Sequence, residues 1–294
     1  MGNVITIGVD LAKSVFPVHG VDAAGAIVVR RQLRRPQVLP FFAKLAPCLV
    51  GMEACATAHH WARAIEELGH RVRLMPPRYV KAYVKSQKND AADAEAICEA
   101  VSRPTMRFVE IKTSEQQSVL ILHRTRQMFV RQRTTLINAI RAHLAAFGIV
   151  AQIGRNGVES LLRIISEPED NRIPEVARSC LKALASQLHL VKRQILEADR
   201  RILAWHRSNE TSRRLDSIPG IGPLVATALV ASVPNPQAFK SSRDLAAWIG
   251  LVPKQNSSGG KERRGAHKEM LSSMPLPKSL LAKSLPTSMP GSFT

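Results

Sequence analysis

Two short apolar runs near the start of the chain each end in a carboxylate. The first run, Val4–Val9, is followed by Asp10, and the second, Leu49–Met52, is followed by Glu53. Short apolar runs of this kind are typical of strands buried in a sheet. Two further acids, Asp90 and Asp93, lie three residues apart near the start of a helical pattern, so both can face one site. These four positions restrict the fold to one that brings strand ends and a helix start together.

Residues 1–108 alternate between strand and helix signals. The pattern predicts strand 4–9, which 16–21 continues after a break, then a hairpin partner at 27–33, helix 36–46, strand 48–52, helix 57–68, strand 71–75 and a helix from Pro76-Pro77. This order predicts an α/β unit with a mixed sheet. It matches the order expected of an RNase H-like fold in which one hairpin strand is abbreviated or missed.

Residues 109–208 lose the strand signal and predict two long helices. The first runs from Ser114 to about Phe147 and ends at Gly148, and Pro174 opens the second. Two arginine pairs recur at seven-residue spacing, so each pair lies on one stripe of the first helix: Arg124 with Arg131, and Arg126 with Arg133. The second helix carries a heptad seam of Leu181, Leu184, Leu188, Val191, Ile195, Ala198, Ile202 and Trp205. The seam fits either a helical hairpin within one chain or a coiled coil between protomers.

Residues 209–265 predict a small all-α domain. The segment Ile218-Pro219-Gly220-Ile221-Gly222, followed by an apolar helix over 225–233, is typical of a helix-hairpin-helix. Gly220 and Gly222 allow a tight turn, whose exposed amides can hold a phosphate at the next helix start. Similar turns also join ordinary helices. Residues 266–294 are rich in proline and serine without a period, which predicts a disordered tail.

The formal net charge of +19 indicates a polyanionic partner, with nucleic acid the leading class. Four scattered cysteines lack the spacing of a zinc site and fit a reducing compartment. The N-terminus carries no signal-peptide pattern, and the longest apolar runs are shorter than a membrane span. We therefore expect a soluble cytoplasmic protein with no membrane partner.

Two clusters carry candidate chemistry. Phosphoryl transfer assisted by two metals needs several anionic oxygens, and Mg²⁺ prefers carboxylate and water ligands. Asp10, Glu53, Asp90 and Asp93 supply such a set, although Asp90 as a helix-start charge and Asp93 as a solvated residue would need no metal. The second cluster is Pro253–Lys261, where serines lie beside glycines and the cations Lys254 and Lys261. Such a serine can attack a phosphodiester, although Ser-Gly-Gly is more often a flexible loop.

The chain resembles the DEDD-type insertion-sequence transposases, which have a RuvC-like N-terminal domain and a C-terminal serine transposase domain. They are also called bridge-RNA-guided serine recombinases. The resemblance covers about residues 3–265. The matching segments are Ile7–Lys13, Glu53, Lys88–Ala94, Ile218–Gly222, Ala247–Pro253 and Ser257–Lys261. Together they are specific, whereas no single one is.

The resemblance implies an acidic tetrad of Asp10, Glu53, Asp90 and Asp93 that binds Mg²⁺. It also implies a serine that forms a phosphoserine link to DNA, with Ser258 preferred and Ser257 the alternative. The implied partners are the DNA of the element ends and target, a structured guide RNA, and further copies of the chain in a dimer or tetramer. The match stops near Gly265. We therefore expect a truncated or frame-shifted copy, and such a copy can lack activity.

Three functions follow from these features. The first is a transposase or recombinase that cleaves and rejoins DNA through Ser258. The second is a RuvC-like metal-dependent nuclease or resolvase in which water attacks. The third is an inactive nucleic-acid-binding remnant. The expected domains are a metal-binding domain at 1–108, long helices at 109–208, an incomplete helix-hairpin-helix serine domain at 209–265 and the tail.

Overall fold

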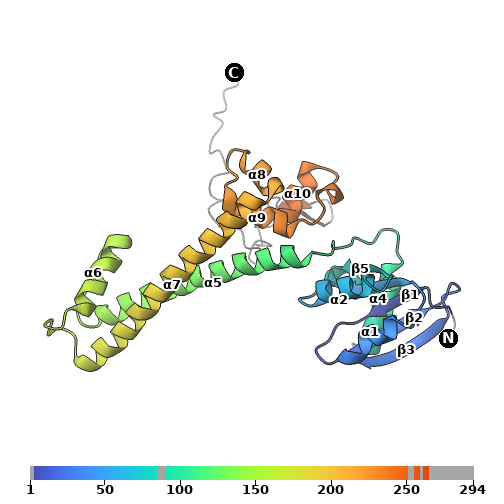
Figure 1. Cartoon of the computed structure of the whole chain (residues 1–294), viewed down its shortest axis with the longest axis horizontal. Helices are drawn as coiled ribbons and strands as arrows, with labels where there is room; N and C mark the ends of the chain where they lie inside the picture. The colour runs from blue at the N-terminus through green and yellow to red at the C-terminus, as the bar shows by residue number, and fades with distance from the viewer. Residues whose placement is uncertain (1–2, 85–89, 251–254, 259–260, 265–294) are drawn as a thin grey trace, which may run out of the picture. The chain divides into compact units, whose positions relative to one another are not determined.

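The computed structural model describes residues 3–84, 90–250, 255–258 and 261–264, with backbone alone for residues 90–91 and the last two ranges. The chain divides into two compact units, Met1–Thr113 and Ser114–Thr294 (Figure 1). No helix among the described residues is both long and apolar enough to span a membrane.

The first unit is built on a mixed five-stranded sheet. Its strands are β1 (Thr6–Val9), β2 (Val15–Val21), β3 (Ile27–Arg34), β4 (Leu49–Glu53) and β5 (Arg71–Met75). Their order across the sheet is β3-β2-β1-β4-β5. β2 runs antiparallel to both β1 and β3, whereas β1, β4 and β5 are parallel. The predicted α/β unit with a mixed sheet is thus confirmed. The hairpin strand that the sequence pattern missed is β2, which is a complete strand of its own.

Helices cover both faces of this sheet. The short helices are η1 (Arg35–Gln37), α1 (Val38–Phe42), α3 (Pro77–Val80) and η2 (Lys81–Tyr83), and the longer ones are α2 (Ala58–Glu66) and α4 (Asp90–Val101). Trp61 and Ile65 of α2 join the core that includes Val9 and Met52, whereas Gly8 and Gly51 face α4. The helix predicted over 36–46 is shorter, since it begins as a 3₁₀ turn at the Arg35–Pro36 step and ends at Phe42.

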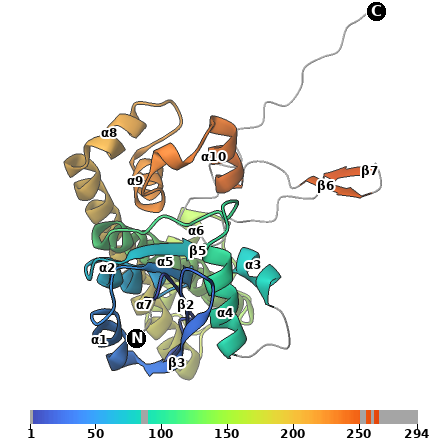
Figure 2. The same cartoon turned by 90° about the vertical axis from the view of Figure 1, so that its right-hand side faces the viewer.

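The second unit is mainly helical. Its helices are α5 (Ser114–Ala145), α6 (Arg155–Ser166), α7 (Glu175–Ser208), α8 (Glu210–Asp216), α9 (Pro223–Ser232), η3 (Pro236–Ala238) and α10 (Ser242–Ile249). Both long helices are confirmed, and Gly148 follows the first with φ of 72°. Two strands, β6 (Gln255–Ser258) and β7 (Lys261–Arg264), pair as an antiparallel hairpin (Figure 2). The prediction of an all-α C-terminal domain was therefore wrong.

The heptad seam of α7 is covered within the chain. α5 and α7 lie side by side (Figure 1), and most seam residues are buried, including Leu188 and Ile202. Trp205 Nε1 donates to Glu115 Oε1 at 2.8 Å, while residues 140 and 144 of α5 share a core with Leu181. The helices therefore run in opposite directions. This is the intramolecular hairpin that the seam allowed.

Candidate active site and nucleic-acid interface

Asp10 and Glu53 lie side by side at the C-terminal ends of two neighbouring strands of the sheet. β1 and β4 are parallel, and Val9 is opposite Met52, so the next residues, Asp10 and Glu53, are neighbours at the strand ends. Adjacent strands are about 4.8 Å apart. Both acids are half-buried. The strands are positioned by the apolar residues that precede the acids, because Ile7, Val9, Val50 and Met52 are fully buried.

Helix α4 brings the other two acids toward the same edge. A Cβ atom at Gly8 would lie 2.2 Å from the carbonyl oxygen of Ala94 and 2.4 Å from the amide nitrogen of Cys98. Helix and strand backbones are therefore in direct contact, which only glycine permits. Cys98 Sγ donates to the carbonyl of Thr6 at 3.6 Å, so the helix N-terminus points toward Asp10. Asp93 precedes Ala94 and is half-buried, and Asp90 is the first residue of α4.

The four predicted acids thus belong to elements that meet at one corner, which we call the acidic corner (Asp10, Glu53, Asp90 and Asp93). Within the residues whose side chains are described, no three Asp, Glu, His or Cys side chains form a group that could hold a metal ion. The Asp90 side chain lies outside that set. The donor chemistry still fits Mg²⁺, because all four residues supply carboxylate oxygens.

Gly8 and Gly51 are positioning residues that the sequence interpretation did not identify as such. At Gly51, an added Cβ would lie 2.8 Å from the Cβ of Val101 in α4. Both glycines sit inside apolar strands, where glycine is otherwise unfavourable and often marks a close approach of another backbone. That signal was available in the sequence, but it does not reveal which element approaches.

The predicted helix-hairpin-helix segment joins α8 to α9. Gly220 has φ of 89°, a conformation that favours glycine, and Gly222 is the N-cap of α9. Both glycines are exposed, and nothing lies within 4 Å of a Cβ built on either. Asn209 caps α8 by accepting from the amide of Ser212 at 2.9 Å. The backbone of this turn is therefore accessible to a ligand.

The four predicted arginines of α5 differ in surroundings. Arg124 and Arg131 are exposed, and Arg133 is half-buried. Arg126 instead donates from Nε to Asp199 Oδ1 of α7 at 2.5 Å. The stripe that includes Arg124 and Arg131 is therefore more available to a ligand than the one that includes Arg126.

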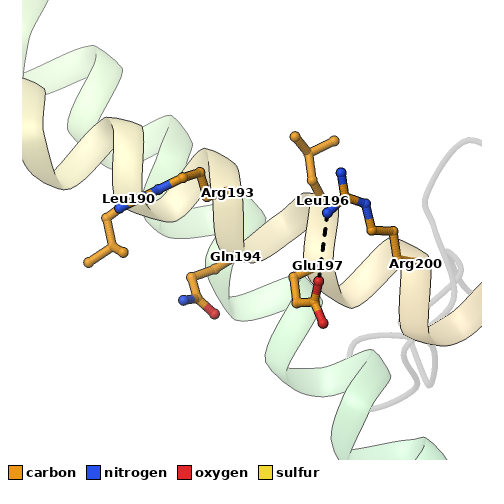
Figure 3. A pocket seen from close by; sticks show the side chains of 6 residues that line it. All are labelled: Leu190, Arg193, Gln194, Leu196, Glu197 and Arg200. Carbon is orange, nitrogen blue, oxygen red and sulfur yellow. Dashed lines mark ion pairs between the residues drawn. The ribbon is translucent and has the colours of Figure 1, made fainter.

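The outward side of α7 combines basic side chains with exposed leucines. Figure 3 shows six side chains of this helix, including Arg193, Glu197 and Arg200. Arg200 and Arg201 both pair with Glu197, at 3.9 Å and 2.9 Å. Since all six side chains come from one helix, they form an open surface rather than an enclosed site.

The candidate serines lie in the β6–β7 hairpin. Ser258 is opposite Lys261 and Ser257 is opposite Glu262. Ser258 ends β6 and Lys261 begins β7, on either side of residues 259–260. Lys254, the other predicted cation, lies outside the described residues. The hairpin belongs to the second unit and the acidic corner to the first.

Comparison with known proteins places the chain among the transposases of insertion sequences. A model of IS110-type DEDD transposases, described as "Transposase", matches residues 7–149, and one described as "Transposase IS116/IS110/IS902 family" matches residues 212–272. The first match contains the whole acidic corner, and the second contains the α8–α9 turn and the β6–β7 hairpin.

Individual relatives agree with these matches. The chain is 48% identical over 264 residues to a "Probable family 20 transposase" of Pseudomonas aeruginosa, covering 90% of this chain and 78% of the relative. It is 41% identical to the transposase for insertion sequence element IS1328 of Yersinia enterocolitica, covering 89% and 77%. The transposase for IS1111A of Coxiella burnetii is 41% identical, covering 89% and 72%. The chain belongs to the IS110/IS116/IS902 family of insertion-sequence transposases.

Proposed function

We propose that this transposase cleaves and rejoins DNA with a metal-binding acidic corner and a serine nucleophile. The observation that carries the first part is the adjacency of Asp10 and Glu53 on parallel strands, with the start of α4 directed at them. The strand order and the flanking helices support a RuvC-like, RNase H-like assignment for residues 1–108. The family match over 7–149 supports the same assignment.

Asp10, Glu53, Asp90 and Asp93 would hold Mg²⁺. The metal would supply positive charge that offsets the developing charge on a phosphate. The chain's own contribution is to orient the carboxylates. Asp10 and Glu53 are carried by buried strands, and Asp93 by a helix whose backbone is in contact with Gly8. Such rigid elements keep the oxygens in place without a cost of ordering when metal and DNA bind.

The nucleophile in this proposal is Ser258, with Ser257 as the alternative. The serine oxygen forms a bond to phosphorus, one DNA oxygen leaves that phosphorus, and the leaving oxygen takes up the serine proton. A hydroxyl of a second DNA end then reverses the exchange, releasing serine and joining the new strand. Lys254 and Lys261, near the serines in sequence, would offset phosphate charge. Residues 209–265 would form the helix-hairpin-helix serine domain.

Nucleic-acid binding would use two surfaces of the second unit. The exposed amides near Gly220 and Gly222 suit a DNA phosphate, because the N-terminus of α9 adds a favourable dipole. Arg124 and Arg131, and to a lesser degree Arg126 and Arg133, would contact the phosphates of DNA or of a structured guide RNA. These interactions predict affinity that falls steeply with salt.

Assembly into a dimer or tetramer belongs to the same proposal. The apolar seam of α7 is already covered by α5, so a coiled coil between protomers needs another surface. Leu190, Leu196 and Leu203 on α7 are 47%, 58% and 40% exposed. Exposed leucines along one helix are compatible with contact to a second copy.

The test is the formation of a covalent protein–DNA adduct on labelled element-end DNA, with Mg²⁺ or with EDTA. Ser258→Ala should abolish the adduct and Ser257→Ala should retain it, and the reverse result assigns the role to Ser257. Cleavage that survives in both variants without an adduct would show that water attacks, as in a RuvC-like nuclease. Strong binding with no metal-dependent cleavage in the unaltered chain would leave a nucleic-acid-binding remnant.

A further inference from the structure

Strand β3 and the residue that follows it carry a dense group of cations at the edge of the sheet. Arg30, Arg31, Arg34 and Arg35 fall within six consecutive residues, and all four are exposed. β3 is the last strand of the sheet, with β2 as its strand neighbour. Within the described part of the chain, none of these arginines forms an ion pair with a carboxylate. Arg35 lies over the Trp61 ring at 5.2 Å, whereas the charges of Arg30, Arg31 and Arg34 remain available to an outside anion.

The strand register places two of the arginines on the face that carries α4. Arg30 is opposite His19, which is opposite Gly8, the glycine that contacts α4. Side chains alternate between faces along a strand, so Gln32 and Arg34 share the face of Arg30. We call these three residues the β3 basic face (Arg30, Gln32 and Arg34).

The same register measures the distance from this face to the acidic corner. The Asp10 amide donates to the Pro17 carbonyl at 3.1 Å, and Pro17 is opposite Gln32. Asp10, Pro17 and Gln32 therefore form one row across three strands. Two strand spacings amount to about 10 Å, a length that neighbouring phosphates of one nucleic-acid strand can cover. One nucleic-acid strand can thus extend from the acidic corner to the β3 basic face.

A depression lies between these elements. Its volume is about 170 Å³, and its lining includes His19, Arg30, Gln32 and Ala94. Ala94 belongs to α4 and follows Asp93, so the depression borders the acidic corner. His19, one of the lining residues, is 4% exposed. An arginine guanidinium beside a depression suits a phosphate group, which it can bind through two parallel hydrogen bonds.

We propose that the β3 basic face binds the backbone phosphates of the DNA strand whose neighbouring phosphate lies at the acidic corner. Arg30 and Arg34 contact the phosphates, and Gln32 donates a hydrogen bond between them. The choice of DNA strand rests on the proposed cleavage at the acidic corner. The binding of phosphodiester groups rests on the arginines, the register and the depression alone. Charged residues also protect edge strands from pairing with other chains, a role that requires no nucleic acid.

The experiment measures binding of the full chain to a labelled DNA single strand in EDTA, at several salt concentrations. Arg30→Gln/Arg34→Gln is compared with Arg71→Gln/Lys44→Gln, a control that removes the same charge from exposed positions elsewhere in the first unit. Each phosphate contact contributes about 0.7 to the slope of log affinity against log salt for a single strand. We expect the slope to fall by about 1.4 in the β3 variant and to stay unchanged in the control. Thermal melting verifies that both variants are folded.

Equal slopes for the β3 variant and the unaltered chain would overturn the proposal, as would an equal fall in the control. An RNA strand of the same sequence forms a parallel arm, and a fall confined to RNA would overturn the assignment to DNA. The measurement needs no cleavage, so it is separate from the proposed function. If Asp10→Asn leaves cleavage intact, the metal site fails while the β3 result stands on its own.

Discussion

Replacing Gly8 with alanine should separate α4 from β1 and disrupt the acidic corner. The new Cβ would lie 2.2 Å from the Ala94 carbonyl oxygen, which is 1.2 Å closer than the 3.4 Å at which ordinary contact begins. The opposing atoms belong to the helix backbone, so no side-chain rotation can relieve the clash. Overpacking of this kind costs about 3 kcal/mol. A shift of about 1 Å at a reacting centre lowers activity about 100-fold.

Gly51→Ala provides a graded comparison. Its Cβ would meet side-chain atoms of Val101 at 2.8 to 3.1 Å, which can adjust more readily than backbone. Urea denaturation should therefore rank Gly8→Ala as more destabilising than Gly51→Ala. Under conditions where both variants remain folded, Mg²⁺-dependent DNA cleavage should fall further in Gly8→Ala. Unchanged stability and activity in Gly8→Ala would refute the contact between α4 and β1.

Three further changes probe the acidic corner and the second unit. Asp93→Asn should lower metal-dependent cleavage at least 10-fold without loss of folding, and unchanged cleavage would remove Asp93 from the site. Arg178 is 3% exposed and donates to carbonyls that include those of Ile164 and Glu167. Arg178→Met should therefore lower the free energy of unfolding, measured by urea denaturation, by about 3 kcal/mol. A loss below about 1 kcal/mol would contradict this. Burial lowers the pKa of His123 to about 4, below the value of about 6.5 in the unfolded chain. The neutral ring therefore stabilises the fold above pH 6.5, and this contribution of about 3 kcal/mol is lost as the pH falls toward 4. His123→Gln should weaken that pH dependence, and an unaltered profile would show that His123 is not its source.

The strands of the first unit were readable from the sequence because they are buried. Val50 and Met52, like Ile7 and Val9, appear as continuous apolar runs bounded by polar residues. Parallel neighbours then place the residues after those runs side by side, which is why Asp10 and Glu53 could be paired in advance. The contact of Gly8 with α4 depends on packing between segments far apart in the chain, and local patterns do not encode it.

The second unit shows where local patterns stop. The seam of α7 was visible, but its period is the same whether α5 or a second protomer covers it. Helix α6 buries Leu161 and Ile165 in the core that Leu181 of α7 also joins, although the amphipathic pattern of α6 was not identified from the sequence. The β6–β7 segment looked like a loop because a Ser-Gly-Gly sequence lies at its centre, whereas the residues that flank Gly259 and Gly260 pair as strands.

The central claim is that the early acids form a magnesium site, and diffraction from crystals containing Mn²⁺ tests it most directly. Anomalous scattering should place a Mn²⁺ ion within coordination distance, about 2.2 Å, of carboxylate oxygens of both Asp10 and Glu53. The peak should disappear in Asp10→Asn crystals grown in the same conditions. Mn²⁺ density elsewhere, or acids whose oxygens point apart at saturating metal, would contradict the account.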